Sequence, residues 1–159
     1  MTDAGDSTAT PESDAGAQNG AADSIRDRLR YVEARLAYEV DVVAARAAQS
    51  GGAVIVDTRK QRSWDHGHVT GALHLPNDRL SGDLDEVPTD RTLIVYGWGP
   101  GCNGETSTAR VLLDRGYDVR EMIGGYEYWV RNGFPVEGVT ADGTLVDLTR
   151  PADPLVTAE

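Results

Sequence analysis

The residue best suited to covalent chemistry is Cys102, the only cysteine among the 159 residues. It lies in a glycine-rich stretch, residues 97–104, between an apolar run that ends at Tyr96 and a segment with helical spacing. Backbone N–H groups at the start of a helix point outward, and the helix dipole favours negative charge there. A thiol at such a place has a stabilised thiolate. The pattern indicates either an anion-binding loop with a nucleophilic or sulfur-carrying cysteine, or a tight turn with an incidental small residue at 102.

Four glycines would let this loop curl without side-chain clashes, namely Gly97, Gly99, Gly101 and Gly104. Two further residues of the loop have competing interpretations. Trp98 either walls a pocket around the thiol or packs against the domain. Asn103 either joins the anion-binding loop or caps the helix that follows.

Two better-known loops fit this stretch less well. Residues 99–104 match G-x-G-x-x-G, the dinucleotide fingerprint, but Pro100 stiffens the turn and only one further strand is expected after it. A cysteine phosphatase loop needs arginine six positions after the cysteine, where this chain has Thr108. We therefore expect neither a dinucleotide cofactor nor phosphatase chemistry.

A second polar group, Asp57 and Arg59, follows another apolar run. The two are either a structural ion pair or a source of positive charge near the loop. His66, His68 and His74 have a spacing that matches no zinc site, so we expect no metal, and His68 is expected to fix a turn by hydrogen bonding.

The elements that position these residues alternate along the chain. Apolar runs predict strands at 53–56, 71–75, 93–96 and 119–123, and apolar spacing predicts helices at 105–115 and 126–131. An earlier helix begins at Ser24, with a break near 38–41 and an end at 51–52. Its apolar stripe is Ile25, Leu29, Val32, Leu36, Val40 and Val43. Strands that alternate with helices predict an α/β domain with a mostly parallel sheet.

Charge divides the chain into three parts. Acidic residues outnumber basic ones 26 to 15, so the formal charge is −11. Residues 1–23 hold five acids and no base, and we expect a disordered tail there; residues 137–159 carry a net −4 and predict a second, loose acidic tail. The predicted domain, 24–136, is nearly neutral at −2.

This acidity disfavours nucleic acid and anionic membranes as partners. With no apolar stretch near 20 residues, no signal pattern and a single cysteine, we expect a soluble, cytoplasmic protein.

Several ordered motifs resemble the rhodanese family. They are Val-Ile-Val-Asp-Thr-Arg at 54–59, Trp-Asp-His-Gly-His-Val-Thr-Gly-Ala-Leu-His-Leu-Pro at 64–76, Leu-Ile-Val-Tyr at 93–96, Gly116-Tyr117, Gly124-Gly125, Trp129, and Gly-Phe-Pro-Val at 133–136. The loop from Tyr96 to Gly104 is similar to that of a long-loop subgroup that reads Tyr-Cys-Trp-Gly-Pro-Gly-Cys-Asn-Gly. The resemblance covers roughly residues 36–136 and implies a three-layer α/β domain whose mostly parallel central sheet is flanked by helices.

The resemblance also implies sulfurtransferase activity without a cofactor. A thiolate would take sulfur from an anion such as thiosulfate, hold it as a persulfide and pass it to cyanide or a thiol acceptor. In rhodaneses the carrier cysteine directly follows the strand, where this chain has Gly97; Cys102 matches the second cysteine of the long-loop subgroup. Either Cys102 carries the sulfur from a shifted position, or the domain is inactive and binds an anion or a protein partner.

Overall fold

The computed structural model describes residues 14–156, with side chains from residue 23 onward. The chain divides into two compact units, Met1–Ala37 and Tyr38–Glu159. In the first unit the described residues belong to one helix, α1, which runs over Asp14–Tyr38. The tail expected at 1–23 lies largely outside the described residues, but residues 14–23 are the first turns of α1.

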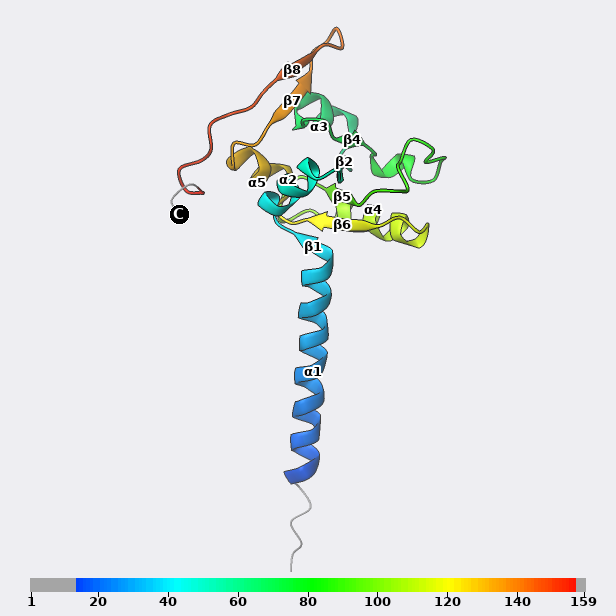
Figure 1. Ribbon diagram of the computed structural model, residues 1–159, viewed down its shortest axis with the longest axis vertical. Coiled ribbons are helices and arrows are strands. Elements are labelled where there is room, and N and C mark those ends of the chain that lie inside the picture. The colour runs from blue at the N-terminus through cyan, green and yellow to red at the C-terminus, as the bar shows by residue number, and fades with distance from the viewer. Residues whose placement is uncertain (1–13, 157–159) are drawn as a thin grey trace, which may run out of the picture. The chain divides into compact units, whose positions relative to one another are not determined.

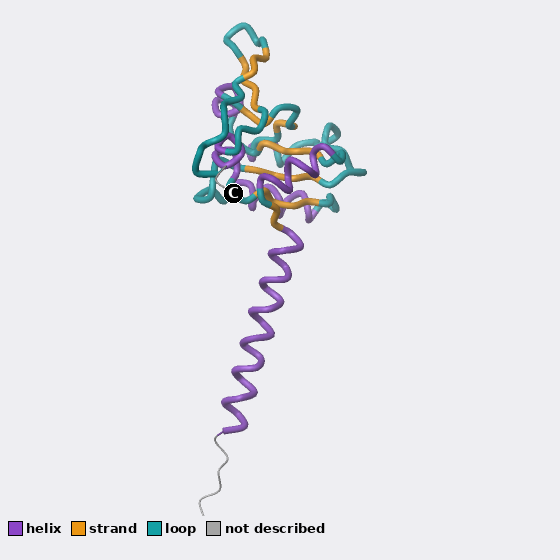
Figure 2. Tube along the Cα trace, turned by 60° about the vertical axis from the view of Figure 1, so that its left-hand side comes forward, coloured by secondary structure: helices purple, strands orange, loops and turns teal. Residues whose placement is uncertain are grey.

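The second unit is an α/β domain built on a five-stranded parallel sheet (Figures 1 and 2). Its strand order is β1-β6-β5-β2-β4. The strands are β1 (Glu39–Val40), β2 (Val54–Asp57), β4 (Leu73–His74), β5 (Leu93–Tyr96) and β6 (Val119–Met122). All four predicted strands are present, and the expected break near 38–41 contains the short β1.

Helices cover both faces of this sheet, because side chains alternate between the faces along each strand. Helices α2 (Val42–Ser50) and α5 (Gly125–Arg131) belong to one layer, and α4 (Gly104–Asp114) to the other. The first core includes Ile55, Ile94, Tyr96, Met122 and Trp129. The second includes Val56, Leu93, Val95, Leu112 and Val119. The expected three-layer architecture is confirmed.

Two short helical elements and a second, antiparallel sheet of the domain were not predicted. Helix α3 (Gln61–His66) and the 3-10 turn η1 (Asn77–Arg79) are short. An antiparallel sheet joins β3 (His68–Val69), β7 (Val136–Val139) and β8 (Leu145–Asp147). Residues 136–147, mostly assigned to a loose tail, therefore form a β-hairpin. Asp142-Gly143, a typical hairpin turn signal, marks the turn.

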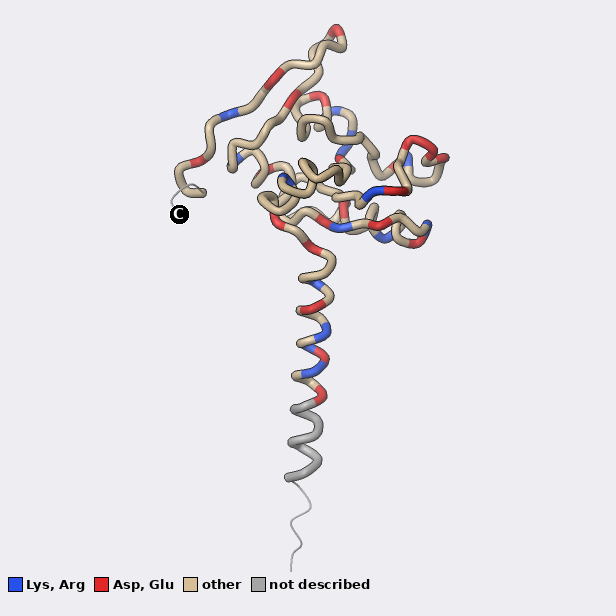
Figure 3. The backbone as a smooth tube through the Cα atoms, viewed as in Figure 1, with Lys and Arg blue, Asp and Glu red and all other residues tan. Residues whose placement is uncertain are grey.

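Charged residues are spread over both units (Figure 3). No helix within residues 14–156 is long and apolar enough to cross a membrane. Among the same residues, no three His, Cys, Asp or Glu side chains are grouped to hold a metal ion.

Candidate functional site

The glycine-rich loop connects β5 to α4 and is anchored to a second helix. The Gly97 carbonyl accepts a hydrogen bond from the Tyr126 N–H (3.0 Å), and the Trp98 carbonyl accepts one from the Glu127 N–H (2.9 Å). The loop backbone thus binds the first turn of α5. Gly125, with φ +56°, makes this approach possible, since a β-carbon there would lie 2.8 Å from the Gly97 oxygen.

The sulfur of Cys102 points toward the place where the family's carrier cysteine would be. A β-carbon on Gly97 would lie 2.9 Å from Cys102 Sγ. Because the Cys102 N–H donates to the Gly99 carbonyl at 3.0 Å, a tight turn brings residue 102 back toward the end of β5. The two positions are five residues apart in sequence, but the turn makes them neighbours in space.

Glu105 occupies the same space, and nothing in the sequence analysis singled it out. Its carboxyl carbon lies 2.7 Å from the position of a Gly97 β-carbon. The side chain is buried, and its Oε2 has no hydrogen-bond partner among the described residues. A carboxylate in this state repels other anions and favours a hydrogen-bond donor or a cation beside it.

Cys102 is partly buried and opens onto a small cavity of about 270 Å³. The cavity is lined by Thr58, Arg59, Lys60, Pro76, Asn77, Asp78, Cys102 and Gly104. Lys60 is the only lysine in the chain. The lining offers one exposed ammonium group to an anion, against one carboxylate, that of Asp78.

Asn77, which the sequence did not single out, lines this cavity and forms hydrogen bonds with α4. Its amide donates to the Gly104 carbonyl (3.3 Å), and its Oδ1 accepts from the Thr108 hydroxyl. Asn103 does occupy the N-cap position of α4, but its side chain makes no capping hydrogen bond. Of the two alternatives for Asn103, the side-chain cap is therefore not formed, although the residue stands at the N-cap position.

Asp57 and Arg59 form a buried ion pair, the structural alternative of the two interpretations. Arg59 Nη2 lies 2.6 Å from Asp57 Oδ2 and also donates to the Gly67 carbonyl at 2.7 Å. The Tyr96 hydroxyl donates to the same Asp57 oxygen at 2.5 Å and accepts from the Val69 N–H. Parallel pairing of β2 with β5 sets Asp57 beside Tyr96 and so creates this network.

The network shifts the ionisation of its members. Burial raises the pKa of Tyr96 well above its ordinary value, and the neighbouring Asp57 charge raises it further. Burial acts to lower the pKa of Arg59, but the hydrogen bond to Asp57 and the electrostatic interactions with Asp57, Tyr96 and Tyr126 together outweigh it, so the pKa is raised. Since Arg59 stays charged and Asp57 neutralises it, the pair adds little free positive charge to the loop.

The three histidines have structural contacts. His68 Nδ1 is 2.9 Å from the Trp64 carbonyl, its ring stacks on Trp64, and its Nε2 lies 3.4 Å from Glu137. His74 Nε2 is 2.8 Å from the Arg59 carbonyl. The expected turn-fixing role of His68 is consistent with its bond to Trp64.

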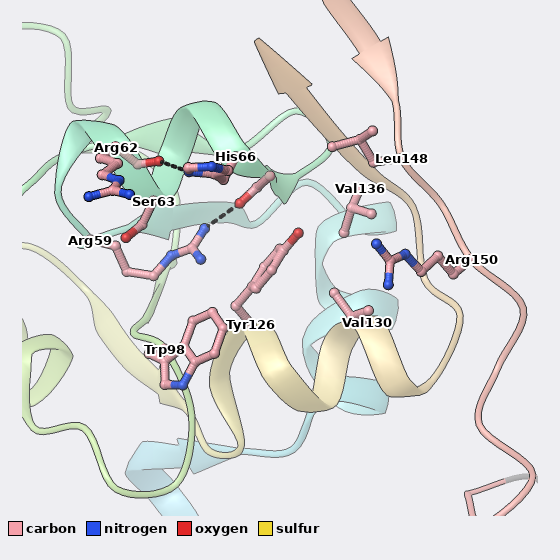
Figure 4. A pocket seen from close by; sticks show the side chains of 11 residues that line it. Arg59, Arg62, Ser63, His66, Trp98, Tyr126, Val130, Val136, Leu148 and Arg150 are labelled. Atoms are coloured by element: carbon pink, nitrogen blue, oxygen red, sulfur yellow. Dashed lines mark hydrogen bonds between the residues drawn. The ribbon is translucent and has the colours of Figure 1, made fainter. Parts of the chain in front are cut away.

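A larger cavity, of about 470 Å³, also has Arg59 in its lining (Figure 4). It is lined by Arg59, Arg62, Ser63, His66, Gly67, Trp98, Tyr126, Val130, Val136, Leu148 and Arg150. None of the described side chains that line it is acidic. Trp98 is 59% exposed and walls the cavity beside Tyr126, at 6.2 Å between ring centroids. Trp98 thus walls a pocket, but Cys102 does not line that pocket.

The parallel sheet with helices on both faces, and a loop at the carboxyl end of β5, define an α/β domain with a site at its strand ends. The family model described as Rhodanese-like domain matches residues 40–132, more than half of the chain. The chain belongs to the rhodanese-like domain family.

Three known proteins are similar to part of this chain. Thiosulfate sulfurtransferase GlpE of Pseudomonas fluorescens is 35% identical over 94 residues, which cover 58% of this chain and 84% of that protein. The HTH-type transcriptional regulator Rv0324 of Mycobacterium tuberculosis is 29% identical over 92 residues, and the chain spans only 41% of it. The crystal structure of the BH2092 protein from Bacillus halodurans, 29% identical, has a TM-score of 0.63 and covers 71% of this chain and 85% of that chain.

Proposed function

We propose that this protein is a rhodanese-type sulfurtransferase that carries sulfur on Cys102. The observation that supports this most directly is the 2.9 Å separation between Cys102 Sγ and the β-carbon position of Gly97. The turn between Gly99 and Cys102 brings the Cys102 thiol next to Gly97, which has no side chain of its own. The similarity to thiosulfate sulfurtransferases and the long-loop resemblance support the same assignment.

In the first step, the Cys102 thiolate attacks the outer sulfur of thiosulfate. A new sulfur–sulfur bond forms, the bond within thiosulfate breaks, and sulfite leaves with its electron pair. In the second step, cyanide or an acceptor thiolate attacks the terminal sulfur of the persulfide, and Cys102 is released as a thiolate. Lys60 offers a positive charge to the incoming anion in the cavity beside the thiol.

A direct test is intact-mass analysis after incubation with thiosulfate. We expect an increase of about 32 Da, one sulfur atom on the thiol, and its loss on addition of cyanide. Cys102→Ser serves as the control, since it leaves a residue of similar size and no carrier. No adduct on the native chain, or an adduct that survives Cys102→Ser, would refute the proposal.

The alternative is a module without turnover that binds an anion. The buried Glu105 carboxylate favours it, because a negative charge beside Cys102 opposes both the thiolate and an anionic donor. In that case the ligand would occupy the larger cavity, where Arg62 and Arg150 offer charge and Trp98 an aromatic wall. The two functions differ in the mass experiment: a binding module forms no sulfur adduct, yet its melting temperature rises with sulfate or citrate and this rise is lost in Arg150→Gln.

A further inference from the structure

Helix α1 carries an apolar stripe along one side. Ile25, Leu29 and Val32 are 62%, 55% and 49% exposed, and Leu36 continues their spacing. The steps between them are four, three and four residues, which is the repeat of positions d and a in a coiled coil. Such a narrow stripe is typical of a helix that pairs with another helix.

The charged residues beside the stripe identify the partner. In this register, Arg28 stands at position g and Glu33 at position e. In a parallel two-stranded coiled coil, position g of one helix lies beside position e of the next heptad of its partner, five residues on. Two copies of α1 would therefore form two Arg28–Glu33 pairs, one on each side of the seam.

Two other acidic residues of the helix form ion pairs with arginines of the same helix. Asp23 pairs with Arg26 at 3.2 Å and Asp27 with Arg30 at 2.6 Å. No ion pair of α1 itself, among residues 23–37, contains Arg28 or Glu33. Figure 3 shows acidic and basic residues following each other along this part of the helix. Arg28 donates to the Ser24 hydroxyl at 3.0 Å, a neutral partner that leaves its charge uncompensated within the helix and able to pair with Glu33 of another copy.

We propose that α1 packs against α1 of further copies as a parallel, in-register coiled coil, which makes the protein a homo-oligomer. Leucine at both a positions with Ile25 and Val32 at the d positions favours more than two strands. The described stripe is short, just under two heptads, so the association is expected to be weak and concentration-dependent. This inference concerns the first unit only and does not depend on the function proposed for Cys102.

The first test is sedimentation equilibrium of the full chain between about 1 and 200 μM, a range that brackets weak association. We expect a monomer–oligomer equilibrium for the native chain and a monomer throughout for Leu29→Asp. Tyr31→Asp is the matched control, because Tyr31 is 65% exposed on the same helix but lies outside the seam. Far-ultraviolet circular dichroism of each variant reports on the helix itself.

The second test exchanges the flanking charges. Arg28→Glu or Glu33→Arg alone creates like-charge pairs between neighbouring helices and is expected to weaken association about 10-fold, whereas the double variant should restore it. In-register pairing also predicts that Leu29→Cys in a Cys102→Ser background oxidises to a disulfide-linked dimer.

Three outcomes would overturn the proposal. These are a monomer at every concentration, equal effects of Leu29→Asp and Tyr31→Asp, and a double charge variant as weak as the single ones. A monomer whose melting temperature falls with Leu29→Asp would show that the stripe is covered by the chain's own domain instead.

Discussion

The sulfur of Cys102 lies 2.9 Å from the position that a β-carbon on Gly97 would occupy. Glu105 reaches the same point from the first turn of α4. The space beside Gly97, directly after β5, is therefore occupied by two side chains, one from the loop and one from α4. Each prediction about activity depends on this arrangement.

Adding a side chain at position 97 should displace the thiol. In Gly97→Ala, the new methyl group collides with Cys102 Sγ and the Glu105 carboxylate, and both must rotate away. We expect the rate of sulfur-adduct formation to fall about 10- to 100-fold, the cost of misplacing a reacting atom by about 1 Å. The melting temperature should change little, since the displaced atoms are side-chain ends. In the control Gly82→Ala, the new carbon meets only an ordinary contact at 3.4 Å, so unchanged kinetics are expected.

Removing the charge of Glu105 should make the thiol react faster with anions. Glu105→Gln keeps the shape of the side chain but removes a buried negative charge beside Cys102. We expect adduct formation with thiosulfate to accelerate about 10-fold, measured by mass spectrometry over time. Glu86→Gln makes the same change in net charge at an exposed position. A rate for Glu105→Gln equal to that of Glu86→Gln would show that the Glu105 carboxylate does not act on the site.

Lys60 should influence thiosulfate binding more than chemistry. Lys60→Gln removes the exposed ammonium group from the cavity that Cys102 lines, so the KM for thiosulfate should rise about threefold or more, with a smaller change in kcat. Lys60→Arg should retain most of the affinity. The effect should shrink as salt is added, because exposed charges are screened. A KM unaffected by Lys60→Gln at low salt would exclude a role for this charge.

The Asp57–Tyr96 hydrogen bond should contribute to stability rather than to chemistry. Tyr96→Phe removes a fully buried hydroxyl that donates to Asp57 and accepts from Val69. We expect the free energy of unfolding to fall by about 1–3 kcal/mol, measured by urea denaturation. Tyr128→Phe changes a residue that is 39% exposed, so its free energy of unfolding should fall much less. Equal losses in the two variants would contradict a special role for the buried network.

Glu121 should make stability depend on pH. Burial raises the pKa of Glu121 above its ordinary value near 4.5, although the Tyr38 hydroxyl donates to it at 3.0 Å. The folded chain therefore holds this proton more tightly than the unfolded chain, so its contribution to stability falls as pH rises from about 4.5 through the folded pKa. Glu121→Gln has no proton to lose. Its melting temperature should decline less between pH 4.5 and 7, and a decline identical to that of the native chain would contradict this.

The local pattern of apolar residues was enough to predict the elements that carry the site. The strand predicted at 93–96 is β5 without adjustment, and the helices predicted at 105–115 and 126–131 match α4 and α5 within one residue. These segments are long apolar runs or regular stripes between glycines, where neighbouring residues decide the conformation. Strands β1 and β3, of two residues each, have no such pattern, because pairing with a distant strand creates them.

The sequence by itself determined the fold class, the family resemblance, the glycine-rich loop and the lone thiol within it. It also contained the apolar stripe of α1, but not whether the domain covers that stripe. Only the tertiary structure decided that Asp57 and Arg59 pair with each other, that Cys102 approaches Gly97, and that Glu105 fills the remaining space. The physical reason is distance: patterns of spacing report on neighbours along a chain, whereas an active site depends on which side chains a turn and a strand end bring within a few ångströms.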